Sequence, residues 1–305
     1  MSATSARGRD LRGILLLDKP RGITSNRALQ RVKRLYGAVK AGHSGSLDPL
    51  ATGMLPICFG AATRLGGFLL DAGKAYRVTA RFGVATDTGD ADGTITERRD
   101  TAAPTELQLR AALARFEGDI EQTPPMYSAL KHAGVRLYRL ARAGTEVPRA
   151  PRLVSIHALA LERYQWPEAE LFVHCSKGTY VRSLVVDLAA ALGTVGLVAE
   201  LRRLAVEPFD GEPMTTFEEL EALAATGGTA ALDARLLPPD RALPGWPSVL
   251  LSAEAAERIA HGQAVAADPA WPGGRVKVYR EPGELLAIGE VTVDRRLAPQ
   301  RVFAR

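Results

Sequence analysis

The sequence predicts an α+β fold in two parts, a large first domain followed by a small, mostly β domain. Segments with strand-like alternation and segments with helical periodicity are mixed without a regular βαβ repeat, which favours α+β over a doubly wound sheet. The length of 305 residues exceeds one average domain. A hydrophobic fraction of 46% and a charged fraction of 24% are ordinary for globular proteins, so disorder is not indicated.

Several segments have the pattern of strands. Gly13 to Leu17 is an apolar run that ends at Asp18, as expected of a buried strand. The alternating stretch 75–83 is followed by a turn rich in acids and glycine, which suits a sheet connection. The remaining predicted strands cover 153–163, 171–176, 275–279 and 285–291.

Helical periodicity is clearest near the N-terminus. Thr24 or Ser25 can cap a helix whose apolar positions, from Ala28 to Leu35, recur at helical spacing. The other predicted helices cover 61–70, 106–116, 135–143, 181–192 and 253–261.

A proline-rich stretch at 236–247, LLPPDRALPGWP, marks a domain boundary, because four prolines make a stiff connection. We therefore expect a flexible tail at 1–12, a first domain at 13–240 and a C-terminal domain at 246–305. A basic insertion at about 124–152 interrupts the first domain. A core of fewer than about 70 residues is thin, so the C-terminal domain is expected to lean on the first domain or on a ligand.

The most constrained stretch is 42–60, GHSGSLDPLATGMLPICFG. Glycines, prolines and hydroxyl side chains surround one acid, Asp48, and this composition predicts a shaped loop rather than a helix or a strand. Pro49 restricts Asp48 to extended backbone geometry and so limits where its carboxylate points. An ordinary Asp-Pro turn would explain the dipeptide alone. The density of constraint on both sides favours a functional loop.

Charge is unevenly distributed along the chain. Residues 1–50 hold ten basic and three acidic side chains, a net of +7, and residues 124–152 hold six basic and one acidic, a net of +5. Residues 201–250 hold four basic and eight acidic side chains, a net of −4. Basic segments beside a shaped acidic loop are what an enzyme acting on a polyanion needs, since lysine and arginine neutralise phosphates. A solvated helix face would explain any one segment equally well.

Cysteine and histidine usage excludes two classes of site. Cys58 and Cys175 are far apart and outside any CxxC pair, and the five histidines lack ligand spacing, so we expect neither a disulfide framework nor a metal site. The first apolar run, Ile14 to Leu17, is too short for a signal peptide or a membrane span. We expect a cytoplasmic protein that does not associate with membranes.

Seven motifs in order carry a resemblance to a known family. They are KPRGITS, GHSGSLDPLATGMLPICFG, KAYRV, TDTGDADG, TPPMYSALKHAGVRLYRLARAG, CSKGTYVRSL and LRRLAVEPF. Together they resemble the bacterial tRNA pseudouridine-55 synthase family, often called TruB. The resemblance runs from about residue 13 to the C-terminus, and the last sixty residues resemble a PUA-type RNA-binding domain. It implies a mixed, mainly antiparallel sheet of the pseudouridine synthase type.

The resemblance also implies an activity. Uridine 55 in the T-loop of tRNA would be flipped out of the folded RNA and isomerised to pseudouridine, by cleavage of its glycosidic bond and formation of a C5–C1′ bond. No cofactor is needed, because the reaction is a rearrangement that consumes nothing. The implied partner is the T-stem-loop of tRNA, with no obligate protein partner, and the protein is expected to be a monomer.

Three residues match the family's catalytic positions. Asp48 matches the catalytic aspartate, and a carboxylate is ionised at neutral pH and able to act as nucleophile or base. It could attack the ribose C1′, attack the uracil C6, or remove a ribose proton to give a glycal, and the resemblance favours the glycal. Tyr76 matches the tyrosine that packs on the target base, and Arg182 the arginine that pairs with the aspartate. By pattern alone, Tyr76 would be a core residue and Arg182 a solvated one.

Substrate-binding roles follow from the same resemblance. His43 matches the residue that fills the space left by flipped bases. Tyr180 and Leu201 match residues that line the pocket, although both would otherwise be assigned to the core. Within the basic insertion, the positions that match phosphate contacts are Lys131, Arg136, Arg139 and Arg142. Lys19 and Pro20 are expected to support the active-site loop structurally.

Three function classes remain open from the sequence. The first is the synthase, whose runner-up within the family is a guide-RNA-dependent enzyme of the archaeal and eukaryotic type. The long basic insertion favours a stand-alone enzyme. The second is an RNA-binding or RNA-folding protein without chemistry. The third is a carboxylate hydrolase such as a glycosidase, which would need a second acid, for which TDTGDADG is the candidate source.

Overall fold

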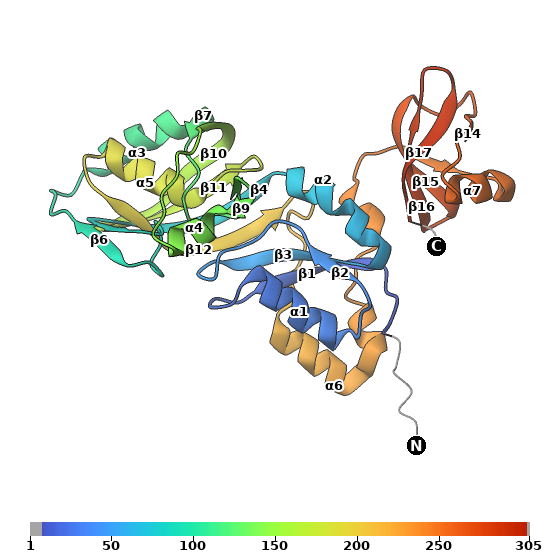
Figure 1. The fold of residues 1–305 in the computed structure, drawn as a ribbon, viewed down its shortest axis with the longest axis horizontal. Helices are drawn as coiled ribbons and strands as arrows, with labels where there is room; N and C mark the ends of the chain where they lie inside the picture. The colour runs from blue at the N-terminus through green and yellow to red at the C-terminus, as the bar shows by residue number, and fades with distance from the viewer. Residues whose placement is uncertain (1–7, 304–305) are drawn as a thin grey trace.

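The computed structural model describes residues 8–303 as two domains, each built on one main sheet (Figure 1). The first domain contains an eight-stranded sheet of order β1-β3-β12-β4-β11-β10-β7, with β2 beside β3. Its strands are β1 (Gly13–Lys19), β2 (Ala41–His43), β3 (Thr52–Phe59), β4 (Lys74–Phe82), β7 (Gly118–Gln122), β10 (Arg152–Gln165), β11 (Glu168–Cys175) and β12 (Gly196–Val206). The predicted α+β class is confirmed.

One strand joins the two halves of this sheet. β12 runs antiparallel to β4 along most of its length, and near its end it pairs in parallel with β3. Every other neighbouring pair in the sheet is antiparallel, so the expected mainly antiparallel arrangement is confirmed. The junction lies where Arg203 is paired with both Gly53 of β3 and Tyr76 of β4.

The prediction of a loop over 42–60 was wrong for 52–59, which form the interior strand β3. Residues 42–43 also belong to a strand, β2, and Gly60 begins a 3-10 turn, so the loop is confined to residues 44–51. β2 pairs with β3 only as far as Ile57, so the strand does not require a main-chain donor at Pro56. The Pro56 carbonyl still accepts a hydrogen bond from the amide of Ser44 (3.0 Å). The missing N–H of the proline therefore falls where the ladder ends.

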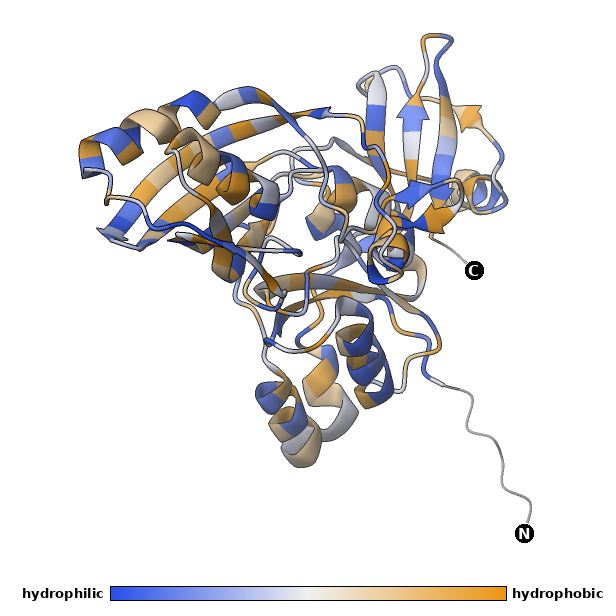
Figure 2. Ribbon diagram, turned by 60° about the vertical axis from the view of Figure 1, so that its left-hand side comes forward, coloured by the Kyte–Doolittle hydropathy of each residue, from blue (hydrophilic) through white to orange (hydrophobic). Residues whose placement is uncertain are grey.

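Helices cover each half of the sheet separately. α1 (Ser25–Leu35) and α6 (Phe217–Asp233) pack on the half that contains β1 and β3, while α3 (Glu106–Leu113) and α5 (Val181–Ala191) pack on the half that contains β4, β11 and β12 (Figure 1). Hydrophobic and hydrophilic residues alternate along the helical turns, as amphipathic helices require (Figure 2). The Thr24 hydroxyl accepts from the Arg27 amide (3.1 Å) and caps α1, as predicted.

Three predicted helices differ in extent from the observed elements. Stretch 61–70 forms a 3-10 turn, η1 (Gly60–Leu65), followed by α2 (Gly66–Asp71), and stretch 106–116 is α-helical only as far as Leu113. In stretch 135–143 the helix is limited to α4 (Leu137–Arg142), because Ala133 and Gly134 take positive φ angles of 47° and 83° and form a hairpin turn that places residues 135–136 in a strand. The short strands of the remaining hairpins are β5 (Val84–Thr86), β6 (Ile95–Arg98), β8 (Lys131–His132) and β9 (Val135–Arg136), and the remaining 3-10 turns are η2 (Ala114–Phe116) and η3 (Pro239–Ala242).

The C-terminal domain has a five-stranded sheet of order β13-β15-β16-β17-β14 and one helix. Its elements are β13 (Ser248–Leu250), α7 (Ala253–Ala260), β14 (Val265–Ala266), β15 (Gly274–Glu281), β16 (Glu284–Val291) and β17 (Arg296–Val302). Ile288 and Phe303 share a hydrophobic cluster with Leu65 and Leu69 of the first domain. The C-terminal domain thus packs against η1 and α2 of the first domain, as expected.

The two ends of the first domain are tied to its sheet. Ile14 of β1 and Leu237 of the proline-rich stretch exchange two main-chain hydrogen bonds, each 2.9 Å long. The amide of Arg9 donates to the carbonyl of Gly37 (2.6 Å), and its side chain pairs with Asp233. Residues 8–12 of the expected tail are therefore packed on the domain, and residues 1–7 lie outside the described residues. Within residues 8–303, no helix combines the length and the apolar character needed to cross a membrane.

The junction at Gly53 generates the first prediction. Gly53 has a φ of +96°, and a Cβ there would lie 2.1 Å from the carbonyl oxygen of Arg203. We expect Gly53→Ala to lower the free energy of unfolding by more than about 3 kcal/mol, because it adds a main-chain clash to backbone strain. Gly211, with a φ of +75° and open space around it, is the matched control, and Gly211→Ala should cost only about 1–2 kcal/mol. Denaturant unfolding measures both, and equal losses would contradict the clash.

Candidate active site

The loop at 44–51 presents Asp48 at the junction of the two half-sheets. Leu47 is pinned to the start of α1, because its amide donates to the Ser25 hydroxyl (2.7 Å), which in turn donates to the Leu47 carbonyl (3.0 Å). The Pro49 carbonyl accepts from the amide of Gly22 (2.8 Å). These contacts hold the main chain on both sides of Asp48, whose side chain is 43% exposed.

Arg182 pairs with Asp48, as the family resemblance implied. Its Nε lies 3.0 Å from the Asp48 carboxylate, and the arginine side chain is only 6% exposed. The two remaining guanidinium nitrogens donate to the carbonyls of Thr88 (2.6 Å) and Tyr127 (2.7 Å). A buried guanidinium held at three points is pre-organised to aim a carboxylate.

Asp90, from the TDTGDADG motif, lies on the same guanidinium at 3.7 Å. Burial raises the pKa of its carboxyl, although hydrogen bonding from Thr88 and the charge of Arg182 oppose the rise. Sequence reasoning singled out the motif only as a source of a second acid. The Asp90 carboxylate also accepts a hydrogen bond from the amide of Asp92 (3.2 Å). Asp90 therefore stabilises its own turn and also contacts Arg182.

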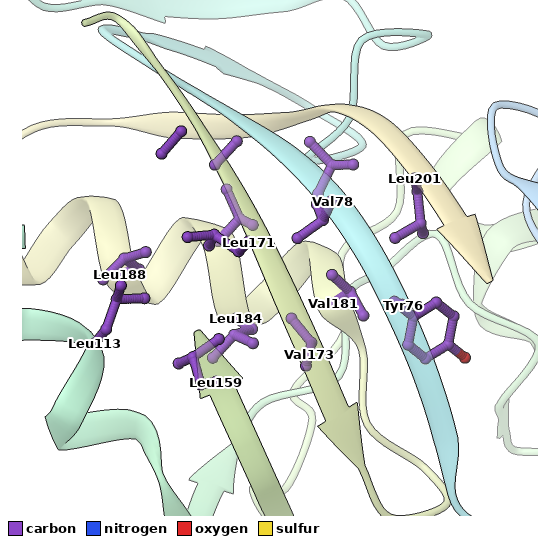
Figure 3. Packing of buried hydrophobic residues seen from close by; sticks show 14 of the residues in the cluster. Tyr76, Val78, Leu113, Leu159, Leu171, Val173, Val181, Leu184, Leu188 and Leu201 are labelled. Carbon is purple, nitrogen blue, oxygen red and sulfur yellow. The ribbon is translucent and has the colours of Figure 1, made fainter. Parts of the chain in front are cut away.

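An apolar wall borders the Asp48 loop. Tyr76 on β4 and Leu201 on β12 lie beside Val181 at one end of the hydrophobic cluster (Figure 3). Tyr76 and Leu201 are each 9% exposed. Tyr180 is half-buried, and its main chain is tied to Gln122, whose side-chain amide accepts from the Tyr180 amide (2.7 Å) and donates to its carbonyl (3.0 Å). Tyr76, Val181 and Leu201 thus belong to one apolar cluster, and a flat ring can pack against side chains of this kind.

His43 ends β2 on the other side of the loop. Its Nδ1 is buried without a hydrogen-bond partner in the described structure. Burial, and secondarily the charge of Arg203, lower the pKa of the imidazole from its usual value of 6.5. The ring is therefore neutral at physiological pH and suited to stacking rather than to binding phosphate.

Two buried cations, Lys19 and Arg203, lie close to the loop at 44–51. The Lys19 ammonium donates to the carbonyls of Pro20 and Ile23, each at 2.9 Å, and burial lowers its pKa to about 8 against the opposing charge of Asp48. This contact agrees with the supporting role expected of Lys19. Arg203 was not predicted. The only signal for it was its place in the LRRLAVEPF motif, because a strand pattern does not distinguish a buried arginine from an exposed one.

The basic insertion contacts the site through Tyr127. Tyr127 anchors it, since its carbonyl accepts from Arg182 and its hydroxyl donates to Asp87 (3.1 Å). The guanidinium of Arg142 lies over the ring of Tyr138, 5.7 Å from its centre. The four predicted phosphate contacts are all exposed on the β8–β9 hairpin and α4: Lys131, Arg136, Arg139 and Arg142.

Two further features bear on ligands. A groove of about 320 Å³ borders the site through Leu50 and Leu201, and three guanidinium groups line it, from Arg21, Arg77 and Arg202. Across the described residues, no cluster of three or more histidine, cysteine, aspartate or glutamate side chains is arranged to hold a metal ion.

Comparisons with known proteins match the whole domain arrangement. The family model described as "TruB family pseudouridylate synthase (N terminal domain)" matches residues 33–181, and two models of TruB C-terminal domains match residues 182–244 and 247–303. A tRNA pseudouridine synthase B from Stutzerimonas stutzeri is 53% identical over 97% of this chain and 96% of its own length. The chain belongs to the TruB family of pseudouridylate synthases. The resemblance seen in the motifs is thereby confirmed, as is the prediction of an enzyme.

Other relatives agree with this membership. A tRNA pseudouridine synthase B from Pseudomonas aeruginosa is 51% identical over 97% of both chains. Among solved structures, the crystal structure of a Cbf5-Nop10-Gar1 complex contains a chain that matches with a TM-score of 0.72 and 25% identity, over 95% of this chain and 84% of that one. The TruB fold of this chain is therefore shared with a protein that assembles with two others.

The neutral state of His43 is directly testable. Because burial lowers its pKa, we expect the titration midpoint of His43 to lie below 6.5 in histidine-selective NMR of the free protein. His43→Asn identifies the resonance. A midpoint above 6.5 would contradict the neutral ring.

Proposed function

We propose that this protein isomerises uridine 55 in the T-loop of tRNA to pseudouridine. The observation that carries the proposal is the Asp48–Arg182 pair (3.0 Å) at the centre of a TruB-family fold. The arginine aims the carboxylate, while the 43% exposure of the Asp48 side chain leaves it open to a substrate.

The reaction balances without any co-reactant. The N1–C1′ bond breaks, the uracil turns, and a C5–C1′ bond forms. The proton on C5 is lost and N1 gains one, so the composition of the RNA is unchanged. We propose that Asp48 starts the sequence as a nucleophile at C1′ or C6, or as the base that gives a glycal.

The surrounding side chains suit a base extruded from the RNA. A uridine inside a folded loop must be flipped before its glycosidic bond can be reached. We propose that Tyr76, Leu201 and Tyr180 pack on the flipped uracil, and that the neutral ring of His43 occupies the vacated place in the RNA stack. Arg182 and Tyr76 are the proposed catalytic partners of Asp48.

Recognition of the RNA is proposed to lie in the insertion and the C-terminal domain. The exposed cations of β8, β9 and α4 are placed to contact phosphates, and the C-terminal sheet is proposed to be a PUA-like RNA-binding module. We propose a monomer that acts in the cytoplasm without a guide RNA or protein partner. The insertion, anchored to Arg182 through Tyr127, supports this choice over a guide-dependent enzyme.

The test uses purified protein and a T-stem-loop transcript with no other RNA or protein. We expect pseudouridine at the position of uridine 55 and no release of free uracil. Release of uracil would favour a hydrolase, and binding without modification would favour an RNA-folding protein. Activity only after a guide RNA is added would favour the guide-dependent class.

Asp48→Asn tests the catalytic assignment. The change removes the charge and keeps the shape, so we expect pseudouridine formation to fall roughly a thousandfold or more, while the dissociation constant for the T-stem-loop stays within about threefold. Single-turnover kinetics and filter binding measure the two quantities. Retained catalysis would remove Asp48 from the mechanism.

The insertion predicts a salt dependence. Arg136→Ala and Arg139→Ala should each weaken T-stem-loop binding and reduce the slope of log K against log salt concentration by roughly one. Arg110→Ala is the control, since its exposed side chain pairs with Glu106 (2.7 Å) on α3 and belongs neither to the insertion nor to the groove. The same change of slope for all three variants would contradict specific phosphate contacts in the insertion.

A further inference from the structure

Arg203 has the largest of the fully buried side chains among residues 8–303. It lies on β12 directly opposite Tyr76 of β4. Its Nε donates to the carbonyl of Met54 (2.7 Å), and its Nη2 donates to the carbonyl of Gly45 (3.0 Å). One guanidinium thus joins strand β3 to the loop that carries Asp48.

The charge of Arg203 needs an explanation beyond packing. A buried guanidinium usually faces a carboxylate, because an uncompensated buried charge is costly. In the described part of the chain, Arg203 donates to main-chain carbonyls instead, and its charge helps to lower the pKa values of Lys19, Lys74 and His43, for each of which burial is the larger cause. An apolar side chain of similar volume would avoid this cost.

The Tyr76 hydroxyl supplies the reason. Arg203 lies directly opposite Tyr76, and its guanidinium acts on the pKa of the phenol through hydrogen bonding as well as through its charge. Because a guanidinium has no acceptor, the tyrosine oxygen must accept, and its own hydrogen is directed away from Arg203. Burial raises the pKa of Tyr76; the charge of Arg203 opposes the rise, and Cys175 on β11 and Asp48 on the loop add to it.

We infer that Arg203 is a positioning residue for the isomerisation, which holds the Tyr76 hydroxyl and the Asp48 loop in one fixed arrangement around the flipped uracil. The inference rests on the proposed function. Arg203 is 1% exposed and does not touch the substrate; it acts through Tyr76 and through Gly45, which lies within the same short loop as Asp48. A small displacement of either group is enough to slow a reaction that depends on alignment.

The experiment compares Arg203→Gln and Arg203→Lys with the wild-type protein, using a T-stem-loop transcript. Arg203→Gln should lower the single-turnover rate by roughly 10–100-fold with the RNA dissociation constant within about threefold. Arg203→Lys keeps the charge and should recover part of the rate. The matched control is Arg81→Gln, which removes an exposed guanidinium of β4 that pairs with Glu168, and its rate should equal that of the wild type.

A second readout separates positioning from folding. The ionisation of Tyr76 is followed by tyrosinate absorbance, as the difference between each protein and the same protein carrying Tyr76→Phe. Since Arg203 lowers the Tyr76 pKa, the midpoint should move to higher pH in Arg203→Gln and return part of the way in Arg203→Lys. If Arg203→Gln fails to fold, the lysine variant decides both readouts, with a lowered rate and a shifted midpoint expected.

Three outcomes overturn the inference: an unchanged rate in a folded variant, a rate loss matched by an equal loss of RNA affinity, or an unmoved Tyr76 midpoint. A wild-type protein that forms no pseudouridine overturns the proposed function instead. The tyrosine titration needs no RNA, so it still reports whether Arg203 governs Tyr76 in that case.

Discussion

The close approach of two main chains at Gly53 is the constraint on which the site depends. Because Gly53 has no Cβ, β12 can pair in parallel with β3 while its other edge stays paired with β4, and the carbonyl of Arg203 lies where a side chain would otherwise stand. This pairing makes one sheet of two halves that have separate hydrophobic cores. It also fixes the place of Asp48, since the loop at 44–51 leads directly into β3.

Two buried arginines contact the loop at 44–51 from different elements of the fold. Arg182 approaches Asp48 from α5 and links it to the Asp90 turn and the insertion through Thr88 and Tyr127. Arg203 approaches from β12 and holds the loop main chain. Both charges are costly to bury, and both guanidinium groups donate to carbonyl oxygens, which fix their direction. Arg182 also pairs with the carboxylates of Asp48 and Asp90, whereas Arg203 lies opposite the phenol of Tyr76.

Another buried cation, Lys74, links helix α2 to strand β4. The Lys74 ammonium caps the end of α2 by donating to the carbonyls of Leu70 (2.7 Å) and Ala72 (2.5 Å), and burial lowers its pKa to about 8. Lys74 begins β4, two residues before Tyr76, and α2 carries Phe68, whose ring packs edge-on against Trp246 at 5.4 Å. Helix α2 thus contacts both the C-terminal domain, through Phe68, and the start of the strand that carries Tyr76, through Lys74.

The sequence by itself determined the elements that have local signals, and it singled out Asp48 as the candidate catalytic residue. Thr24 marks the start of α1 by its side chain, and the glycine and proline pattern around Asp48 marks a constrained segment whatever surrounds it. The motifs were sufficient to predict the family and to nominate Arg182 and Tyr76. Strand β3 was missed, because Pro56 is acceptable in a strand only where its neighbour ends, and that neighbour is chosen by the fold.

Only the tertiary structure decided how these residues act together. Arg203 and the Gly45 carbonyl are 158 residues apart in the chain, and no periodicity or spacing links groups at such a distance. Whether an arginine is buried against a tyrosine or solvated depends on which strands lie beside it. The physical reason is that residue type and local pattern set what a side chain can do, while burial and partners, which set its charge state and direction, arise only when β3, β4 and β12 meet.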